Sequence, residues 1–317
     1  MKKLFYPLLI LTSLLIFTLS AIAQGFATDY ALNPSEMTQK ELNQQSILGI
    51  NWVQTSGEYR ALAYQGFNVG KIAFDRAIEH NIPNPAVLVD LDETLLDNTP
   101  YQASLIGADE GFNTQTWNQW ILAEETRAVP GAVEFVNYIN DNGGKVFFIS
   151  NRNNSSTYNP QNNDLELATM KNMIELGFEG VTEETLLLKG EFTKTINGRV
   201  DTRKQWRMDA ITGGMVDSID HSAIMFVGDN LNDFSEIDKN NNEVRKEFVD
   251  NTQAQQGIFV LTENGFKPAY ISIPNPMYGY WENGLYDAET FGKSSIWDLT
   301  PAQKLFQRIE SLIRWKN

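Results

Sequence analysis

The stretch Ala86–Thr94, AVLVDLDET, decides the fold that we expect for this chain. Its first four residues form a short apolar run between a pair of prolines and an aspartate, which is typical of a fully buried strand. Asp90, Asp92 and Thr94 follow that run directly. Ligands bind beyond the carboxyl ends of the strands in an open α/β sheet, so the same nine residues indicate both a fold and a site.

Similar apolar runs recur along the chain, and segments with helical spacing separate them. We expect further strands at Lys145–Ser150, Thr185–Leu188, Ala223–Val227 and Ile258–Leu261. We expect helices at Ser35–Thr55, Gly57–His80, Gly131–Asn142, Leu165–Leu176 and Glu243–Asn251, and a last helix that begins at Thr300-Pro301. Strands that alternate with helices predict an α/β fold, a Rossmann-like parallel sheet with helices on both faces.

One domain is expected over residues 24–317. Its core sheet would come from residues 84–94 and 130–272, approximately, and a smaller helical subdomain from residues 35–80 and 95–129. We find no internal repeat that would indicate a solenoid or an array.

The composition excludes several classes of protein. With 42% hydrophobic residues among 317, the chain can bury a large core and is not mainly disordered. The absence of cysteine excludes disulfides, thiolate metal sites and a cysteine nucleophile. A net charge of −15 disfavours binding to a nucleic acid polymer, and the presence of only two histidines disfavours a histidine-rich catalytic or metal site.

The first 23 residues have the layout of a cleavable secretory signal. Lys2 and Lys3 precede an apolar stretch, residues 8–19, and Ala21-Ile22-Ala23 ends the segment with small residues at the right spacing. The apolar stretch is shorter than the ~20 residues that a spanning helix needs. We therefore expect cleavage after Ala23, no stable membrane anchor afterwards, and a net charge that changes from −15 to −17 as the two lysines are lost.

Polar side chains follow two other expected strands. They are Ser150, Asn151 and Arg152 after the second strand, and Asp229 and Asp233 after the fourth. Four aspartates that meet at one edge of a sheet repel one another, and a hard divalent cation offsets that repulsion. Oxygen ligands select Mg²⁺ over softer metals, so Asp90, Asp92, Asp229 and Asp233 predict a magnesium site.

This arrangement resembles the haloacid dehalogenase-like phosphatase superfamily. Asp90, Asp92 and Thr94 match its first motif, Ser150 its second, and Asp229 with Asp233 its fourth. Lys204 is the candidate for the basic residue of the third motif, with Lys189 and Lys194 as rivals.

Within that superfamily the chain is most similar to the class C bacterial acid phosphatases, the lipoprotein-type 5′-nucleotidase and acid phosphatase branch. The similarity covers most of the expected mature chain and includes DLDETLLDNTP (90–100), FISNR (148–152), GDNLNDF (228–234) and the aromatic stretch 274–281. Many members of the branch have a signal that ends in cysteine, which this chain lacks. The resemblance to this branch, together with the absence of the cysteine, implies a periplasmic or secreted bacterial enzyme.

The resemblance implies a magnesium-dependent acid phosphatase that hydrolyses phosphate monoesters through an aspartyl-phosphate. Asp90 would be the nucleophile, and Asp92 would protonate the leaving group and then deprotonate water. Asp90, the backbone carbonyl of Asp92 and Asp229 would hold Mg²⁺, while Asp233 would orient the ligands around it. The candidate phosphate or substrate contacts are Thr94, Ser150, Asn151, Arg152, Lys204 and Tyr278; Arg152 fits pairing with the local carboxylates equally well.

The identity of the ester is the least defined part of the interpretation. Phe112, Trp117 and Trp120 lie between the first two motifs, and with Tyr278 they could stack on a base, which makes nucleoside 5′-monophosphates candidate substrates. Packing within a helical subdomain explains Trp117 and Trp120 better. An acid pH optimum follows if Asp92 must be protonated in the rate-limiting step.

Two other functions fit the same fold. A non-catalytic phosphate-ester binding or storage protein would need neither Asp90 nor Asp92, and a dehalogenase would need neither Asp92 nor the pair Asp229 and Asp233. The expected partner is a small phosphomonoester; the sequence leaves the oligomeric state open, and a homodimer is compatible with it.

Overall fold

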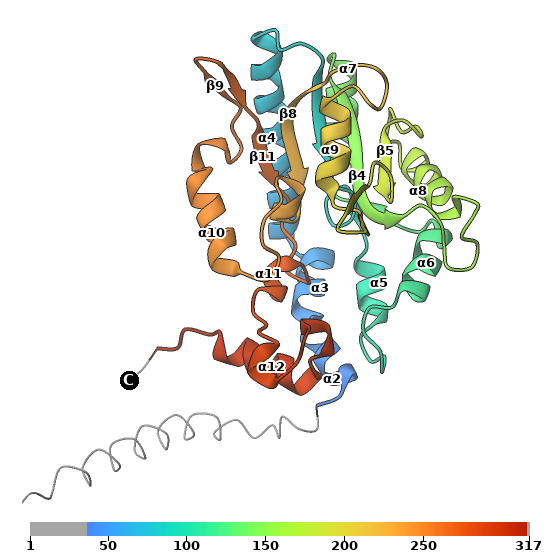
Figure 1. Cartoon of the computed structure of the whole chain (residues 1–317), viewed down its shortest axis with the longest axis vertical. Helices are drawn as coiled ribbons and strands as arrows, with labels where there is room; N and C mark the ends of the chain where they lie inside the picture. The colour runs from blue at the N-terminus through green and yellow to red at the C-terminus, as the bar shows by residue number, and fades with distance from the viewer. Residues whose placement is uncertain (1–36, 316–317) are drawn as a thin grey trace, which may run out of the picture. The chain divides into compact units, whose positions relative to one another are not determined.

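The run that opens the motif becomes β1 (Pro85–Val89), the central strand of a five-stranded sheet (Figure 1). The structure is a computed structural model that describes residues 37–315. The strand order is β11-β8-β1-β4-β5, and all four neighbouring pairs are parallel. The other strands of the sheet are β4 (Lys145–Asn153), β5 (Leu186–Lys189), β8 (Ser222–Gly228) and β11 (Ala269–Ser272).

Helices come before, between and after the strands of the main sheet. They are α2 (Gln39–Gln44), α3 (Ile47–Thr55), α4 (Gly57–Glu79), α5 (Thr99–Ser104), α6 (Thr114–Ala123), α7 (Ala132–Asp141), α8 (Asp164–Glu175), α9 (Lys204–Thr212), α10 (Asn242–Asn251), α11 (Tyr280–Asn283) and α12 (Pro301–Glu310). The short 3₁₀ helices are η2 (Leu231–Asp233), η3 (Gln253–Gln255), η4 (Glu289–Phe291) and η5 (Ile296–Asp298). Three antiparallel pairs lie outside the main sheet: β2 (Leu96–Asp97) with β3 (Arg127–Ala128), β6 (Lys194–Ile196) with β7 (Arg199–Asp201), and β9 (Val260–Thr262) with β10 (Gly265–Lys267).

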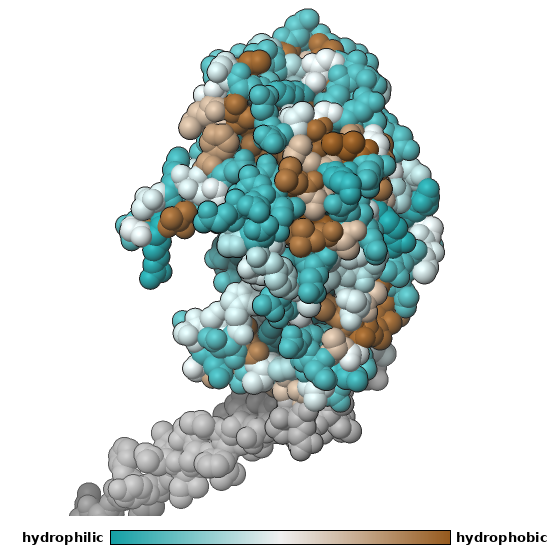
Figure 2. Space-filling view, turned by 90° about the vertical axis from the view of Figure 1, so that its right-hand side faces the viewer, coloured by the Kyte–Doolittle hydropathy of each residue, from teal (hydrophilic) through white to brown (hydrophobic). Residues whose placement is uncertain are grey.

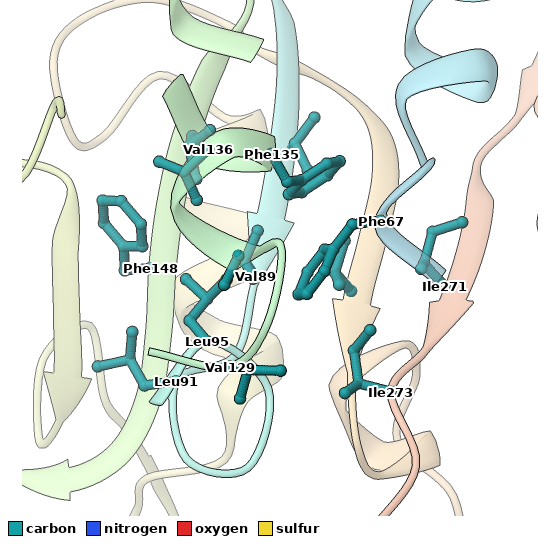
Figure 3. Packing of buried hydrophobic residues seen from close by; sticks show 14 of the residues in the cluster. Phe67, Val89, Leu91, Leu95, Val129, Phe135, Val136, Phe148, Ile271 and Ile273 are labelled. Carbon is teal, nitrogen blue, oxygen red and sulfur yellow. The ribbon is translucent and has the colours of Figure 1, made fainter. Parts of the chain in front are cut away.

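Successive side chains of a strand point to opposite faces, and both faces of this sheet are covered. On one face Val89 and Phe148 belong to the large buried cluster that includes Phe67 of α4 and Phe135 of α7 (Figure 3). On the other face Leu88 and Phe147 pack with Met208 and Ile211 of α9, and Figure 1 shows α9 in front of the sheet. The expected parallel sheet flanked by helices is therefore confirmed.

Helix α4 packs directly against this core. Its buried residues Ala63, Phe67, Gly70 and Phe74 recur at three- and four-residue spacing and form one face. Gly70 allows a close approach of α7, because a Cβ atom at this position would lie 2.8 Å from the ring of Phe135. The expected division of the chain into a core sheet and a smaller helical subdomain stays a prediction. Helix α4, which belongs to the expected subdomain, packs on the sheet.

Two details of the expected order are wrong. The single helix Ser35–Thr55 is divided within its described part, because the chain turns at Gln45 and Ser46 between α2 and α3. The segment Ile258–Leu261 does not enter the main sheet: its end forms the hairpin β9–β10, and Ile258 and Leu261 are exposed. The fifth strand is β11, whose Ala269 and Ile271 are buried against the core.

The expected signal segment, residues 1–23, lies outside the described residues. Among residues 37–315 no helix is both long and apolar enough to cross a membrane.

The two phenylalanines between α4 and α7 provide a test of this packing. Phe135 is fully buried and its ring centroid lies 5.2 Å from that of Phe67. We expect Phe135→Ala to lower the free energy of unfolding by about 3–5 kcal/mol, because it removes buried apolar area and leaves a cavity. Urea denaturation measures the change. The control, Ile72→Ala on the exposed side of α4, should change stability by less than about 0.5 kcal/mol, and equal effects of the two would contradict the packing.

Candidate active site

Three leucines hold the loop after β1 in place. Leu91, Leu95 and Leu96 are fully buried, and the backbone N–H of Leu95 donates to the carbonyl of Leu91 at 2.8 Å. Leu91 lies within the motif, between Asp90 and Asp92, and Leu95 and Leu96 follow directly after Thr94. As a result Asp90, Asp92 and Thr94 are fixed at the carboxyl edge of the sheet.

Asp90 forms an ion pair with Lys204, the first residue of α9. Both side chains are less than a tenth exposed. The ammonium of Lys204 also lies 2.7 Å from Oδ1 of Asp233, and the hydroxyl of Thr94 donates to Oδ2 of Asp90 at 3.3 Å. The first residue of α9 thus places its ammonium between the carboxylate of Asp90, which follows β1, and that of Asp233, in the loop after β8.

The second acidic group comes from the turn after β8. Asp233 ends η2, where its Oδ2 accepts from the N–H of Asn230 at 3.0 Å. Gly228 is required at the end of β8, because a Cβ atom there would lie 2.4 Å from the Cβ of Asp233. Asp229 points into the same space, and its Oδ2 accepts from Nδ2 of Asn275 at 2.8 Å.

Asp90, Asp229 and Asp233 each offer a carboxylate oxygen, and these three oxygens lie within 4.8 Å of one another. Burial raises the pKa of Asp90 to about 7 despite the nearby Lys204, with Asp233 and Asp92 adding to the rise. Burial, followed by the charges of Asp233 and Asp90, also raises the pKa of Asp229 well above its usual value. Burial alone would lower the pKa of Lys204, but Asp233 and Asp90 outweigh it and raise that pKa.

The cluster suits a divalent cation. Lys204 contacts two of the three carboxylates, whereas among residues 37–315 the third, Asp229, has the amide of Asn275 as its hydrogen-bond partner. Burial, followed by the charges of neighbouring carboxylates, raises the pKa values of Asp90 and Asp229, so a positive charge placed among them would be favoured. Carboxylate oxygens at this spacing are ligands that hard divalent cations prefer, so the residues present fit such an ion.

Asp92 lies beside the cluster and is held by separate donors. Nη2 of Arg152 lies 2.7 Å from its Oδ1, and Nδ2 of Asn98 donates to the same oxygen at 2.9 Å. In the described part of the chain its Oδ2 has longer contacts, 3.2 Å from Nε of Arg152 and 3.4 Å from the hydroxyl of Ser150. The sequence left open whether Arg152 binds substrate or pairs with a local carboxylate. In the structure its guanidinium pairs with the carboxylate of Asp92.

The end of β4 is braced by a residue that sequence reasoning missed. Arg207 of α9 is fully buried and donates to the backbone carbonyl of Ser150. Its other amino group lies 3.4 Å from Oδ1 of Asn151 and 3.3 Å from the carbonyl of Thr202. No local pattern distinguishes this arginine, since two of its partners, Ser150 and Asn151, lie more than 50 residues away in the sequence.

A second missed residue is Glu93, inside the first motif. It adopts a left-handed backbone conformation, φ +61°, and its side chain is buried. One carboxylate oxygen accepts from the N–H of Asn98 at 3.2 Å, and the other accepts from the hydroxyl of Tyr278. Burial, with Asp92 and Asp229 nearby, raises the pKa of Glu93 well above its usual value. Glu93 therefore connects the motif loop to the late aromatic loop.

These groups open into one large cavity of about 1180 Å³, lined by Asp90, Asp92, Asn151, Arg152, Lys204, Asp229, Asp233 and Tyr278 among others. Figure 2 shows the surface hollowed by a notch at its left-hand edge. Phe112 and Trp117 also line the cavity. Thr94 and Ser150 are fully buried beneath it and reach the site through Asp90 and Asp92.

The remaining sequence candidates lie further from the cluster. Lys189 lines the cavity, and Lys194 lies 3.8 Å from Asp209 and over the ring of Trp206. Lys204 is the lysine of the three that contacts Asp90. Trp120 donates its indole N–H to Oδ1 of Asn98 at 2.8 Å, which supports the partner of Asp92.

The fold and the site together define an α/β enzyme with an acidic centre at the carboxyl edge of its sheet. Comparison with known proteins agrees: residues 19–281 match the family described as HAD superfamily, subfamily IIIB (acid phosphatase). Two solved structures of the class C acid phosphatase from Bacillus anthracis, one with tungstate bound, are 32% identical to this chain. Each structure superimposes with a TM-score of 0.68. The match covers 87% of this chain in both cases, and 100% and 99% of the two phosphatase chains, respectively.

The chain therefore belongs to this acid phosphatase family of the HAD superfamily, and it is a phosphomonoesterase. The resemblance drawn from the sequence motifs is confirmed.

The raised pKa of Asp90 makes stabilisation by a divalent cation depend on pH. Between about pH 4 and 7 the folded protein keeps a proton on Asp90 that the unfolded chain has lost, so metal-free stability falls as pH rises through this window. A bound cation replaces that proton. We expect the increase in Tm on adding Mg²⁺ to be larger at about pH 8 than at about pH 5, as measured by thermal unfolding.

Asp229→Asn is the matched control for this measurement, because it removes one carboxylate of the cluster and should reduce the Mg²⁺-dependent increase at both pH values. A Tm increase that is equal at both pH values in the unaltered protein would contradict the account.

Proposed function

We propose that this phosphomonoesterase is magnesium-dependent and acts through a phosphorylated Asp90. The observation that carries the proposal is the position of Asp90 at the end of β1, in contact with Lys204 and Thr94 and grouped with Asp229 and Asp233. Phosphoryl transfer needs a nucleophile, positive charge near the phosphoryl oxygens and a proton for the leaving group. This site has a candidate residue for each of the three.

Asp90 would attack the phosphorus atom of the ester with a carboxylate oxygen, and the alkoxide would leave on the opposite side. Lys204 would donate hydrogen bonds to phosphoryl oxygens and so offset the charge of the transition state. Mg²⁺ held by Asp90, Asp229 and Asp233 would supply further positive charge at the same place. Asn151, at the rim of the cavity, can donate its amide N–H to the phosphoryl group.

Asp92 would protonate the leaving alkoxide and afterwards remove a proton from water. Arg152 and Asn98 hold its Oδ1 with hydrogen bonds of 2.7–2.9 Å, while Oδ2 has only contacts of 3.2 Å or more. The proton is therefore exchanged at Oδ2. Arg152 acts on the reaction by orienting this carboxylate.

Asp90→Asn tests the nucleophile. We expect release of p-nitrophenol from p-nitrophenyl phosphate in the presence of Mg²⁺ to fall by about a thousandfold or more, because an amide is a poor nucleophile. Excess chelator should abolish turnover by the unaltered enzyme. Asp250→Asn, at an exposed position on α10, is the control and should behave as the parent enzyme. Turnover that survives Asp90→Asn would mean that the active site is elsewhere.

We propose nucleoside 5′-monophosphates as one class of substrate. Tyr278 and Tyr280 line the same cavity as Asp90, and the hydrogen bond to Glu93 fixes the ring of Tyr278. Trp117 and Phe112 also line the cavity; Trp117 lies against Tyr101 with ring centroids 5.0 Å apart, and Phe112 packs beside it. Aromatic rings that line the same cavity as a phosphate site support stacking of a base.

Tyr278→Ala tests this substrate class. Loss of a stacked base should raise the KM for adenosine 5′-monophosphate about tenfold, while the KM for ribose 5-phosphate, which has no base, stays within about twofold. Steady-state kinetics with both esters measure the difference. Equal changes for the two esters would show that Tyr278 does not contact the base.

We also propose that the protein is exported by bacterial cells to the periplasm or the medium. The support is the layout of residues 1–23, with its basic start, apolar centre and small residues at 21 and 23. N-terminal sequencing of the protein recovered from outside the cytoplasm should begin at Gln24. A product that keeps residues 1–23 would contradict the proposed cleavage.

A further inference from the structure

We propose that Lys304, with the rings of Tyr286 and Trp297, forms a second anion-binding subsite in the active-site cavity. This subsite would select phosphomonoesters whose leaving group carries a second anionic group, a carboxylate or another phosphate. The inference rests on the proposed function, because it concerns the leaving group of the ester that Asp90 cleaves.

The cavity extends from the catalytic aspartates to the C-terminal segment. Tyr286, Trp297, Lys304 and Arg308 line it together with Asp90 and Asp92. Its volume, about 1180 Å³, exceeds the ~300–1,000 Å³ of ordinary small-molecule sites, so a phosphate and a small alcohol would leave much of it unfilled. The family match ends at residue 281, which places these four lining residues outside the matched region.

This wall of the cavity is fixed by polar contacts rather than loosely attached. Arg308 of α12 donates to the hydroxyl of Tyr286 at 2.7 Å and to Oε1 of Gln45 at 2.6 Å, and it pairs with Glu282. The amide of Gln307 donates to the carbonyl of Asp287 at 2.7 Å. The start of α12 is capped by Thr300 with Gln303 in a capping box. Lys304 is therefore held on a rigid helix.

Lys304 is a half-buried cation without an acidic partner. Within residues 37–315 its ammonium forms no ion pair or hydrogen bond, and it lies 5.8 Å from the ring centroid of Tyr286 and 6.0 Å from that of Trp297. The carboxylate of Glu282 acts on it electrostatically but already accepts hydrogen bonds from Arg308 and Tyr286. Burial lowers the pKa of Lys304, and the nearby charge of Arg308 adds to this effect while Glu282 opposes it.

An anionic group of a ligand would supply the missing partner. A buried or half-buried charge is stabilised by pairing, and an ammonium can donate three hydrogen bonds to carboxylate or phosphate oxygens. The centroids of the two aromatic rings lie 5.8 and 6.0 Å from the ammonium, within reach of a cation–π contact, and Lys304 lines the cavity that a ligand would enter. A substrate that places its phosphoryl group at Asp90 and a second anion at Lys304 would occupy both ends of the cavity.

The test uses two series of alkyl phosphates of increasing chain length, one ending in a methyl group and the other in a carboxylate. For the unaltered enzyme we expect kcat/KM of the carboxylate ester to exceed that of the matched methyl ester by about tenfold at one range of lengths only. Lys304→Gln should abolish this preference. Lys293→Gln, in the same segment but outside the cavity lining, is the control and should keep it.

The subsite would be overturned if no chain length favours the carboxylate, or if Lys304→Gln keeps the preference. Thermal unfolding of the variant shows whether it is folded. Calorimetric binding of the matching non-hydrolysable phosphonates gives the same comparison without turnover: a dissociation constant that depends on the carboxylate and on Lys304 supports the subsite, and one that depends on neither contradicts it. Failure of the phosphatase proposal itself would appear separately, as absence of p-nitrophenyl phosphate turnover.

Discussion

The structure depends on one electrostatic constraint: three carboxylates, those of Asp90 and Asp233 buried and that of Asp229 half-buried, meet at the carboxyl edge of the sheet. Oxygens of Asp90, Asp229 and Asp233 lie within 4.8 Å of one another, and such a group is unfavourable away from water unless positive charge compensates it. Lys204 compensates Asp90 and Asp233 directly. The part of the charge that remains gives the site its capacity for a divalent cation, and a cation at this place is what a phosphoryl group requires for charge neutralisation.

The rest of the fold serves to hold that cluster against its own repulsion. Parallel pairing of β1 with β8 brings Asp90 and Asp229 to the same edge, and the absence of a side chain at Gly228 lets Asp233 approach. Buried Leu91, Leu95 and Leu96 attach the loop after β1 to the core and so hold the carboxylate of Asp90 near the other two. Arg207 braces the end of β4 from the other face. Stability and function are therefore linked, because the same buried contacts that order the loops also concentrate the charge.

Much of this arrangement could be predicted from local sequence. Asp90, Asp92, Asp229 and Asp233 each follow an apolar run closely, and a parallel sheet brings the ends of such runs together. The sequence could not distinguish Lys204 from Lys189 and Lys194 as the basic residue of the site, because the direction of the first side chain of a helix cannot be read from the local sequence. Glu93 was missed, since its partner Tyr278 is 185 residues away and its left-handed backbone leaves no sequence signal. The run Ile258–Leu261 misled for the opposite reason: its composition resembles a buried strand, but Phe259 is its one buried residue and its end enters the hairpin β9–β10 outside the main sheet.

The central claim is that Asp90 is the group that receives the phosphoryl group, and one chemical measurement tests it directly. Borohydride reduces an aspartyl-phosphate to homoserine, so enzyme quenched during turnover of p-nitrophenyl phosphate can be reduced, digested and analysed by mass spectrometry. The account predicts homoserine at position 90, dependent on substrate. Homoserine at position 92 instead, or none in an enzyme that is turning over, would contradict it.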